Sequence, residues 1–79
     1  MNYRLLYFAS LADLAACAEE MRESSAHTPR ELYAEVAVAH AFTLGADRLR
    51  VAVNGAFVDW THALAEGDEI VFLPPVSGG

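Results

Sequence analysis

The clearest single feature of this sequence is a helix start at Thr28-Pro29-Arg30-Glu31. A threonine hydroxyl can cap the first amides, proline has its φ preset for the first turn, and Glu31 can return a hydrogen bond to the cap amide. Apolar residues then recur at helical spacing, at Leu32, Val36 and Ala39. A helix with one apolar stripe covers a single face of a sheet. We therefore expect a helix that begins at Thr28, ends before Gly45 and packs on one face of a sheet.

The strands of that sheet are indicated on both sides of the helix. Residues 3–8 are rich in aromatic and large aliphatic side chains, and residues 49–53 alternate large apolar side chains with Arg50 and a small residue. Asn54-Gly55 supplies the two positive-φ residues of a tight hairpin turn. Residues 56–60 should therefore return as the next strand.

The C-terminal part predicts a last strand followed by a tail. Glu66-Gly67-Asp68 is typical of a turn, and residues 69–73 form a mostly apolar run behind it. Pro74-Pro75 ends this strand, because two prolines remove two donors from the hydrogen-bond ladder in succession. The four residues beyond, Val-Ser-Gly-Gly, have no core-forming content. We expect a domain over residues 1–73 and a flexible C-terminal tail over residues 74–79.

The segment between the first strand and the Thr28 helix is ambiguous. Ser10 stands three residues before Asp13, a capping pattern that suits a helix start. Apolar residues follow at helical spacing, at Leu11, Leu14, Ala15, Ala18 and Met21. Taken alone, this periodicity predicts one helix from Ser10 to about Arg22.

Length and composition predict one α+β domain. A chain of 79 residues has room for a single core, and 54% hydrophobic with 20% charged residues is typical of globular proteins. The element order suggests a roll in which a mixed sheet is covered on one face by a main helix. The longest apolar stretches are far below the roughly 20 residues of a membrane span, so we expect no membrane insertion and a cytoplasmic location.

The charge pattern argues against nucleic acid and favours a basic protein partner. The formal net charge is −6, and the five cationic residues are dispersed arginines that make no basic stripe. The sequence contains no lysine, so no side-chain amine is available as an isopeptide acceptor. In conjugation chemistry this chain would therefore be the donor.

Individual reactive side chains give weak signals. Cys17 is the single cysteine, and we interpret it as a small apolar packing residue in preference to a reactive thiol. The histidines lack the spacing of metal ligands, so we expect no metal site at His27, His40 or His62. A solvated acidic run is the simplest interpretation of Glu19, Glu20 and Glu23, and contacts to a basic partner are the alternative.

The terminal Gly78-Gly79 points to chemistry at the free carboxylate of Gly79. Two residues without Cβ atoms make a backbone thin enough to enter a narrow catalytic channel. From Pro74 to Gly79 the extended chain spans about 20 Å, at roughly 3.3 Å per residue, which is enough to reach into a partner's active site. The plain alternative is a frayed end without a role.

Residues 67–79, Gly-Asp-Glu-Ile-Val-Phe-Leu-Pro-Pro-Val-Ser-Gly-Gly, resemble the ending of the small subunits of molybdopterin synthase. The resemblance extends through the Phe8-Ala9 junction, the Thr28-led helix and the Val53-Asn54-Gly55 hairpin. It implies a β-grasp, ubiquitin-like fold with an extra strand after a short first helix. On this basis we expect residues 18–24 to form a strand, because tertiary pairing overrides local helical propensity.

The resemblance also implies a sulfur-carrier cycle in molybdenum cofactor biosynthesis. An adenylating enzyme, similar to those that activate ubiquitin, would attach AMP from ATP to Gly79. A sulfur donor would convert the adenylate to a thiocarboxylate, and the large synthase subunit would use that sulfur to build the dithiolene of molybdopterin. The implied assembly is a heterotetramer without a permanently bound cofactor. The carrier is not catalytic alone, since the acids and bases belong to its partners.

Strand alternation predicts an exposed apolar face on the side of the sheet away from the helix. Large apolar residues share a strand face with a charged residue in three places: Leu6 and Phe8 with Arg4, Phe57 with Asp59, and Val71 and Leu73 with Glu69. Such a face usually marks a partner site. The alternative is that loops cover some of these residues, or that they are assigned to the wrong face by an error in the strand register.

The resemblance implies where a partner would contact this face and the tail. The positions concerned are Phe8, Phe57, Leu73, Pro74, Pro75, Val76 and Ser77. One departure from the family pattern is Ala12-Asp13, where relatives often carry Arg-Glu, so we expect no partner contact through an arginine there.

Three alternatives to the molybdopterin interpretation stay open. A thiamine-pathway sulfur carrier shares the fold and the Gly-Gly end but usually lacks the two prolines, so Pro74-Pro75 argues against it. A ubiquitin-like modifier ligated to target lysines would use the same activated terminus. A plain β-grasp binding module would carry its two terminal glycines incidentally.

Overall fold

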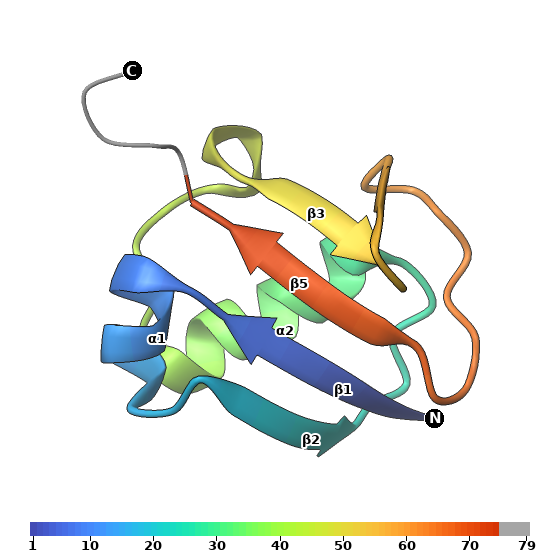
Figure 1. The fold of residues 1–79 in the computed structure, drawn as a ribbon, viewed down its shortest axis with the longest axis horizontal. Coiled ribbons are helices and arrows are strands. Elements are labelled where there is room, and N and C mark those ends of the chain that lie inside the picture. The colour runs from blue at the N-terminus through green and yellow to red at the C-terminus, as the bar shows by residue number, and fades with distance from the viewer. Residues whose placement is uncertain (75–79) are drawn as a thin grey trace.

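The computed structural model describes residues 1–74 and contains a five-stranded mixed sheet with one helix across a single face (Figure 1). The elements in chain order are β1 (Asn2–Tyr7), α1 (Ala9–Ala15), β2 (Glu19–Glu23), α2 (Pro29–His40), the 3-10 turn η1 (Ala46–Arg48), β3 (Arg50–Val53), β4 (Ala56–Val58) and β5 (Glu69–Leu73). The strand order is β2-β1-β5-β3-β4, with β1 and β5 parallel and the other pairs antiparallel. The predicted α+β roll is confirmed.

The core lies between the sheet and α2. Alternate residues of the three central strands are buried toward the helix, at Tyr3, Leu5, Tyr7, Val51, Val53, Ile70 and Phe72. The helix contributes Pro29, Leu32, Tyr33 and Val36. The Tyr33 ring meets the Phe72 ring edge-on, with centroids 5.1 Å apart. Each large buried side chain adds roughly 1.5–3 kcal/mol, so this one interface holds the domain together. Ala39, predicted for the stripe, is exposed, because Tyr33 and Val36 complete the covering face.

The start of α2 is capped almost as predicted. Thr28 Oγ1 accepts a hydrogen bond from the Glu31 amide at 3.2 Å. The return bond differs from the prediction, because the Glu31 carboxylate accepts from the amide of His27, at 2.7 Å, and not from the cap residue. The helix ends at Ala41, whose φ of 58° is left-handed, well before Gly45.

The structure of residues 9–23 shows which of two predictions is correct, a helix to about Arg22 or a strand over residues 18–24. The helix α1 is short, begins without a side-chain cap from Ser10, and ends where Ala16 turns left-handed at φ 60°. The chain then pairs as β2 against β1, with Leu5 opposite Glu20. The strand predicted over 18–24 is confirmed and the helix to Arg22 is wrong, because pairing with the free edge of β1 outweighs helical periodicity.

The two predicted turns are present and are tied to each other. Asn54 and Gly55 have φ values of 52° and 88°, as a hairpin turn between β3 and β4 requires, and Gly67 has φ 84°. The Asn54 side chain donates to Asp68 Oδ1 at 2.9 Å and accepts from the Glu69 amide at 3.0 Å. These bonds fix the register of β5 beside β3. The strand predicted over 56–60 is shorter and ends at Val58.

Strand β2 is held to α2 by polar side chains rather than by apolar ones. Glu20 accepts a hydrogen bond from the Tyr7 hydroxyl at 2.7 Å and lies 2.9 Å from His40 Nε2. Arg22 donates to Glu20 at 3.1 Å and to Glu35 at 2.5 Å. The acidic run predicted over residues 19–23 is therefore divided by strand alternation. Glu19 and Glu23 are exposed, whereas Glu20 is half-buried in this network.

The network sets the ionisation of its carboxyl groups. Burial alone would raise the pKa of Glu20, but hydrogen bonds from Tyr7, His40 and Arg22 hold it below its ordinary value. The hydrogen bond from Arg22 lowers the pKa of Glu35 against the opposing effect of burial. Burial, with the bond to Glu20, raises the pKa of Tyr7 far above its ordinary value. Both carboxylates are thus ionised in the folded chain at neutral pH.

This arrangement predicts that acid weakens the fold through the network. Groups whose pKa is lower in the folded state stabilise it above their unfolded pKa, and that stability is lost as the pH falls through the folded pKa. The free energy of unfolding should therefore fall as the pH drops below about 5. Glu35→Gln should cost about 1 kcal/mol at pH 7 and flatten this decline, as measured by denaturant melts.

Glu23→Gln is the matched control, because Glu23 is exposed and makes no ion pair within residues 1–74. It should leave both the stability at pH 7 and the acid decline unchanged. Identical pH profiles for the two variants would contradict the role given to the network.

Candidate functional site

The face of the sheet opposite α2 carries large apolar side chains. Directly paired residues on neighbouring strands point to the same face. The register joins Leu6 to Val71, Val71 to Ala52 and Ala52 to Phe57, so one row crosses four strands of this open face. The row explains how residues distant in the sequence form a continuous surface.

The exposure of these residues agrees with the prediction from alternation. Phe57 is 64% exposed and Phe8 is 50% exposed. Leu6, Val71 and Leu73 are half-buried. We call this set, Leu6, Phe8, Phe57, Val71 and Leu73, the apolar patch. Exposed large apolar residues gathered on one face are typical of a protein-docking surface.

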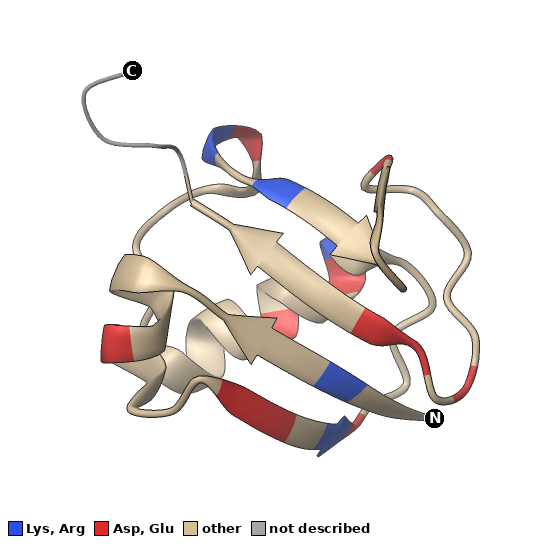
Figure 2. Ribbon diagram, in the orientation of Figure 1, with Lys and Arg blue, Asp and Glu red and all other residues tan. Residues whose placement is uncertain are grey.

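Charged residues border the apolar patch at its two ends (Figure 2). At one end Arg4 forms ion pairs with Glu19 and with Glu69, the latter at 3.7 Å. At the other end Arg50 pairs with Leu73, and its guanidinium carbon lies 5.6 Å from the centroid of the Phe57 ring. The second contact is a cation–π interaction that fixes the ring beside the end of β5.

The topology brings the start of the C-terminal tail to this surface. Strands β1 and β5 are parallel, with Tyr7 opposite Phe72, so Phe8 and Leu73 leave the sheet at the same end. Pro74 follows Leu73 and is half-buried. The remaining predicted site residues, Pro75, Val76, Ser77, Gly78 and Gly79, lie outside the described residues, and their roles stay predictions.

Comparison with known proteins places the chain in a family. The ThiS family matches residues 5–79. The chain belongs to the ThiS family. The match covers all five strands and both α-helices apart from the first residues of β1.

One curated relative and two solved structures show which ThiS-family proteins this chain is similar to. The molybdopterin synthase sulfur carrier subunit of Escherichia coli (strain K12) is 33% identical, over 96% of this chain and 98% of the relative. The crystal structure of SAMP1, small archaeal modifier protein 1, from Haloferax volcanii has a TM-score of 0.82 at 27% identity and full coverage of both chains. A putative molybdopterin converting factor subunit 1 from Pyrococcus furiosus has a TM-score of 0.80 at 29% identity, over 96% of this chain and 99% of that one. The β-grasp fold and the resemblance to molybdopterin synthase small subunits are confirmed.

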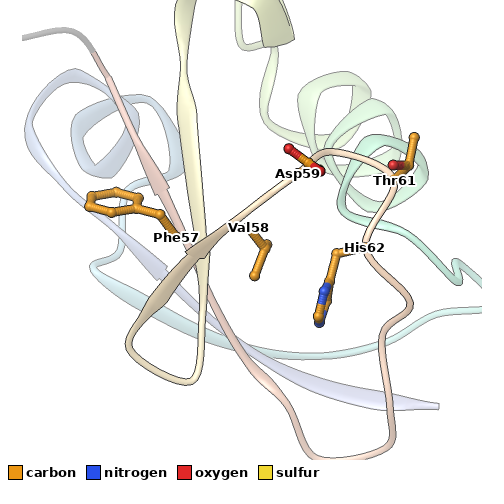
Figure 3. Close-up of a pocket in the computed structure, with 5 residues that line it drawn as sticks. All are labelled: Phe57, Val58, Asp59, Thr61 and His62. Carbon is orange, nitrogen blue, oxygen red and sulfur yellow. The ribbon is translucent and has the colours of Figure 1, made fainter.

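A shallow hollow of about 450 Å³ borders the patch at β4 in this ThiS-family chain (Figure 3). It is lined by Phe57, Val58, Asp59, Thr61 and His62. Figure 3 shows Phe57 on one side of the strand, and Val58 with His62 on the other. The hollow is wide and open and has no converging set of polar groups, so we assign it no ligand.

The other residues considered in the sequence analysis lie outside the apolar patch. Cys17 is half-buried and packs against the core, as interpreted from its sequence. Ala12 also packs against the core, and Asp13 is exposed. Among residues 1–74, no three His, Cys, Asp or Glu side chains converge on a possible metal ion. Within the same residues, no helix is long and apolar enough to span a membrane.

Sequence reasoning missed one member of the site, Arg50. Its alternation with Leu49 and Val51 places it on the open face, but only the register places it beside Leu73 and over Phe57. The apolar residues were found because period-two alternation needs no knowledge of which strands are neighbours.

The exposure of Phe57 predicts that its ring adds little to folding. Phe57→Ala should change the free energy of unfolding by less than about 1 kcal/mol, because the ring buries little area within the domain. Phe72→Ala is the matched control: this phenylalanine is fully buried in the neighbouring strand β5, and its truncation should cost about 3–5 kcal/mol. Denaturant melts measure both. A core-sized loss for Phe57→Ala would mean that the two sheet faces are assigned the wrong way round.

Proposed function

We propose that this chain is the sulfur carrier subunit of a molybdopterin synthase and acts in molybdenum cofactor biosynthesis. The observation that carries the proposal is its 33% identity, over 96% of its length, to the Escherichia coli subunit of that name. The Pro74-to-Gly79 ending supports it independently, because it provides the reach and the thin backbone that a carried C-terminus needs.

The chemistry takes place at the carboxylate of Gly79, which is a poor electrophile until it carries a leaving group. An adenylating enzyme joins a carboxylate oxygen to the α-phosphorus of ATP, and pyrophosphate leaves. Sulfur at the oxidation level of sulfide then attacks the acyl carbon, so that a C–S bond forms and the C–O bond to AMP breaks. The product is a thiocarboxylate whose sulfur is nucleophilic.

On the large synthase subunit, the thiocarboxylate sulfur attacks a carbon of the molybdopterin precursor, so that a C–S bond forms and the bond from that carbon to an oxygen leaving group breaks. Water then cleaves the acyl C–S bond of the resulting thioester, which leaves the sulfur on the precursor as part of the dithiolene and returns the Gly79 carboxylate for another cycle. In this division of labour the small domain supplies docking and presentation. The activating enzyme, the sulfur donor and the large subunit supply the acids, bases and ATP site.

The apolar patch is the surface that we assign to docking. A docking surface must lie where the tail begins, and Phe8 and Leu73 leave the sheet at that end. The exposed Phe57 ring lies over the same region of the sheet, held by Arg50. Large aromatic side chains are typical anchors of protein interfaces.

Two other kinds of protein with an activated C-terminus compete with this proposal, a thiamine-pathway sulfur carrier and a ubiquitin-like modifier. The ThiS-family match alone fits a thiamine-pathway carrier as well, and Pro74-Pro75 favours the molybdopterin branch. Similarity to SAMP1 favours a ubiquitin-like modifier as the second candidate. A modifier would be recovered joined to target lysines, whereas a sulfur carrier would be recovered as the free thiocarboxylate.

The proposal predicts a specific mass change at the C-terminus. Incubation with the adenylating enzyme, ATP and a sulfur source should raise the intact mass by the difference between one sulfur and one oxygen atom. Gly79→Ala should keep the melting temperature while greatly reducing sulfur transfer, because we expect the tail to lie outside the core, and changes outside the core are usually within about 0.5 kcal/mol. Intact-mass spectrometry and a transfer assay measure these effects. Absence of the mass shift in the wild-type chain would refute the sulfur-carrier proposal.

Docking through the apolar patch predicts a loss of affinity for the large subunit. Phe57→Ala should weaken binding by about 1–3 kcal/mol, the range of an interface anchor. Val38→Ala is the matched control, because Val38 is 85% exposed on α2, in the other layer of the fold. Titration calorimetry with the large subunit measures both. Equal affinities for the two variants would move the docking surface elsewhere.

A further inference from the structure

Arg50 occupies a position that the sulfur-carrier chemistry does not by itself require. It is exposed, it is the cross-strand neighbour of Leu73, and its guanidinium lies over the Phe57 ring. Arg4 and Arg22 form ion pairs with two carboxylates each. Arg50 forms no ion pair and no side-chain hydrogen bond with any residue of the described part of the chain.

Arg48 adds a second cation at the same end of the sheet. It ends η1, two residues before Arg50, is exposed, and likewise makes no ion pair within residues 1–74. Asp47 precedes Arg48 in η1, and Asp59 lines a hollow together with Arg50, so two acidic residues share this end of the sheet, although neither forms an ion pair with these arginines. In Figure 2 the blue segments of η1 and β3 lie near each other beside the end of β5, and η1 also carries a red segment.

The opposite end of the open face carries an excess of negative charge. Arg4 is enclosed by Glu19 and Glu69, which leaves that group with an excess negative charge. Asp68 and Glu66 precede Glu69 in the chain and add to it. The apolar patch therefore lies between an acidic end and an end where the guanidinium groups of Arg48 and Arg50 are unpaired within residues 1–74, and this second end is the one from which the C-terminal tail departs.

We propose that Arg50, supported by Arg48, is an electrostatic docking determinant that meets carboxylates of the large synthase subunit around the mouth of the channel that receives the tail. This inference rests on the proposed function and names the charge of the partner surface that the function needs. A carboxylate can accept from the guanidinium N–H groups, which the described side chains leave unused, while the ring of Phe57 keeps the guanidinium in place.

The charge arrangement would orient the complex before the apolar surfaces meet. Apolar contact has no preferred direction, whereas charges act across about 8–10 Å at physiological salt. In a reversed approach the guanidinium groups of Arg48 and Arg50 would face the partner's cations, and the acidic end would face its carboxylates, which is repulsive. Arg50 thus selects the approach in which the tail enters first, despite the overall charge of −6.

The test measures association rates of the full chain with the large subunit by stopped flow, at low and at physiological salt. Arg50→Glu should slow association about tenfold at low salt, with a smaller effect at high salt. Arg48→Glu should slow it in the same direction without touching Phe57, and Arg50→Lys should keep a rate close to that of wild type. Arg30→Glu is the matched control, an exposed arginine at the start of α2 with the same change in net charge, and should alter the rate less than twofold.

The outcomes separate this inference from the function on which it rests. Equal effects of Arg50→Glu and Arg30→Glu would overturn the inference, because only net charge would then matter. Faster association of Arg50→Glu would also overturn it, since the mouth of the channel would be cationic. A wild-type chain that forms its thiocarboxylate but fails to bind the large subunit would refute the docking partner, whereas one that forms no thiocarboxylate would refute the proposed function.

Discussion

A single helix covering a single face of the sheet is the constraint on which the rest of this structure depends. Among residues 1–74, α2 is the one helix long enough to cross the strands, and its buried side chains cover only one side of the sheet. The contact between the rings of Tyr33 and Phe72 is part of this interface between the helix and the sheet. The other side of the sheet has no layer over it within residues 1–74, so its apolar side chains are partly or largely exposed. In our proposal, the docking surface of so small a domain is this uncovered side of the core sheet.

The two edges of the sheet are managed in different ways. At β2 the network of Glu20, Arg22 and Glu35 takes the place of apolar contacts with α2, and the outward residues Glu19 and Glu23 are charged. Charges on an exposed edge discourage pairing with other chains. At β4 the strand is only three residues long, which limits the ladder it can offer. Both features disfavour association through the edges of the sheet.

Features with a local signal could be predicted from the sequence. The Thr28 cap, the Asn54-Gly55 hairpin and the strand Glu69–Leu73 were found because cap, turn and strand-end residues act within a few positions of themselves. The helix predicted from Ser10 to Arg22 failed because β2 exists only through its pairing with β1, which no local pattern contains. Ala39 was misplaced for a related reason, since the covering stripe of α2 is set by where the sheet lies.

The residues of the candidate site also fall into those with a local sequence signal and those that depend on tertiary pairing. Alternation alone indicated the exposure of Phe8 and Phe57, whereas the placement of Arg50 over Phe57 required the register of β3. The prediction of chemistry at Gly79 rests on the family resemblance and on the Gly-Gly ending, because a reactive carboxylate at a chain end does not affect the fold.

The position of β5 has a consequence for how the protein becomes competent. This strand follows every other strand in the chain, yet it lies between β1 and β3 and pairs with both. Until β5 is inserted, the two halves of the sheet have no common backbone partner, so the row from Leu6 to Phe57 is interrupted at Val71. The strand that completes the sheet is also the strand from which the tail departs. In the proposed sulfur carrier, the docking surface would therefore form in the same cooperative event that sets the start of the tail beside it. A partly unfolded chain would present the activating enzyme of the proposed cycle with the C-terminal peptide but without that surface.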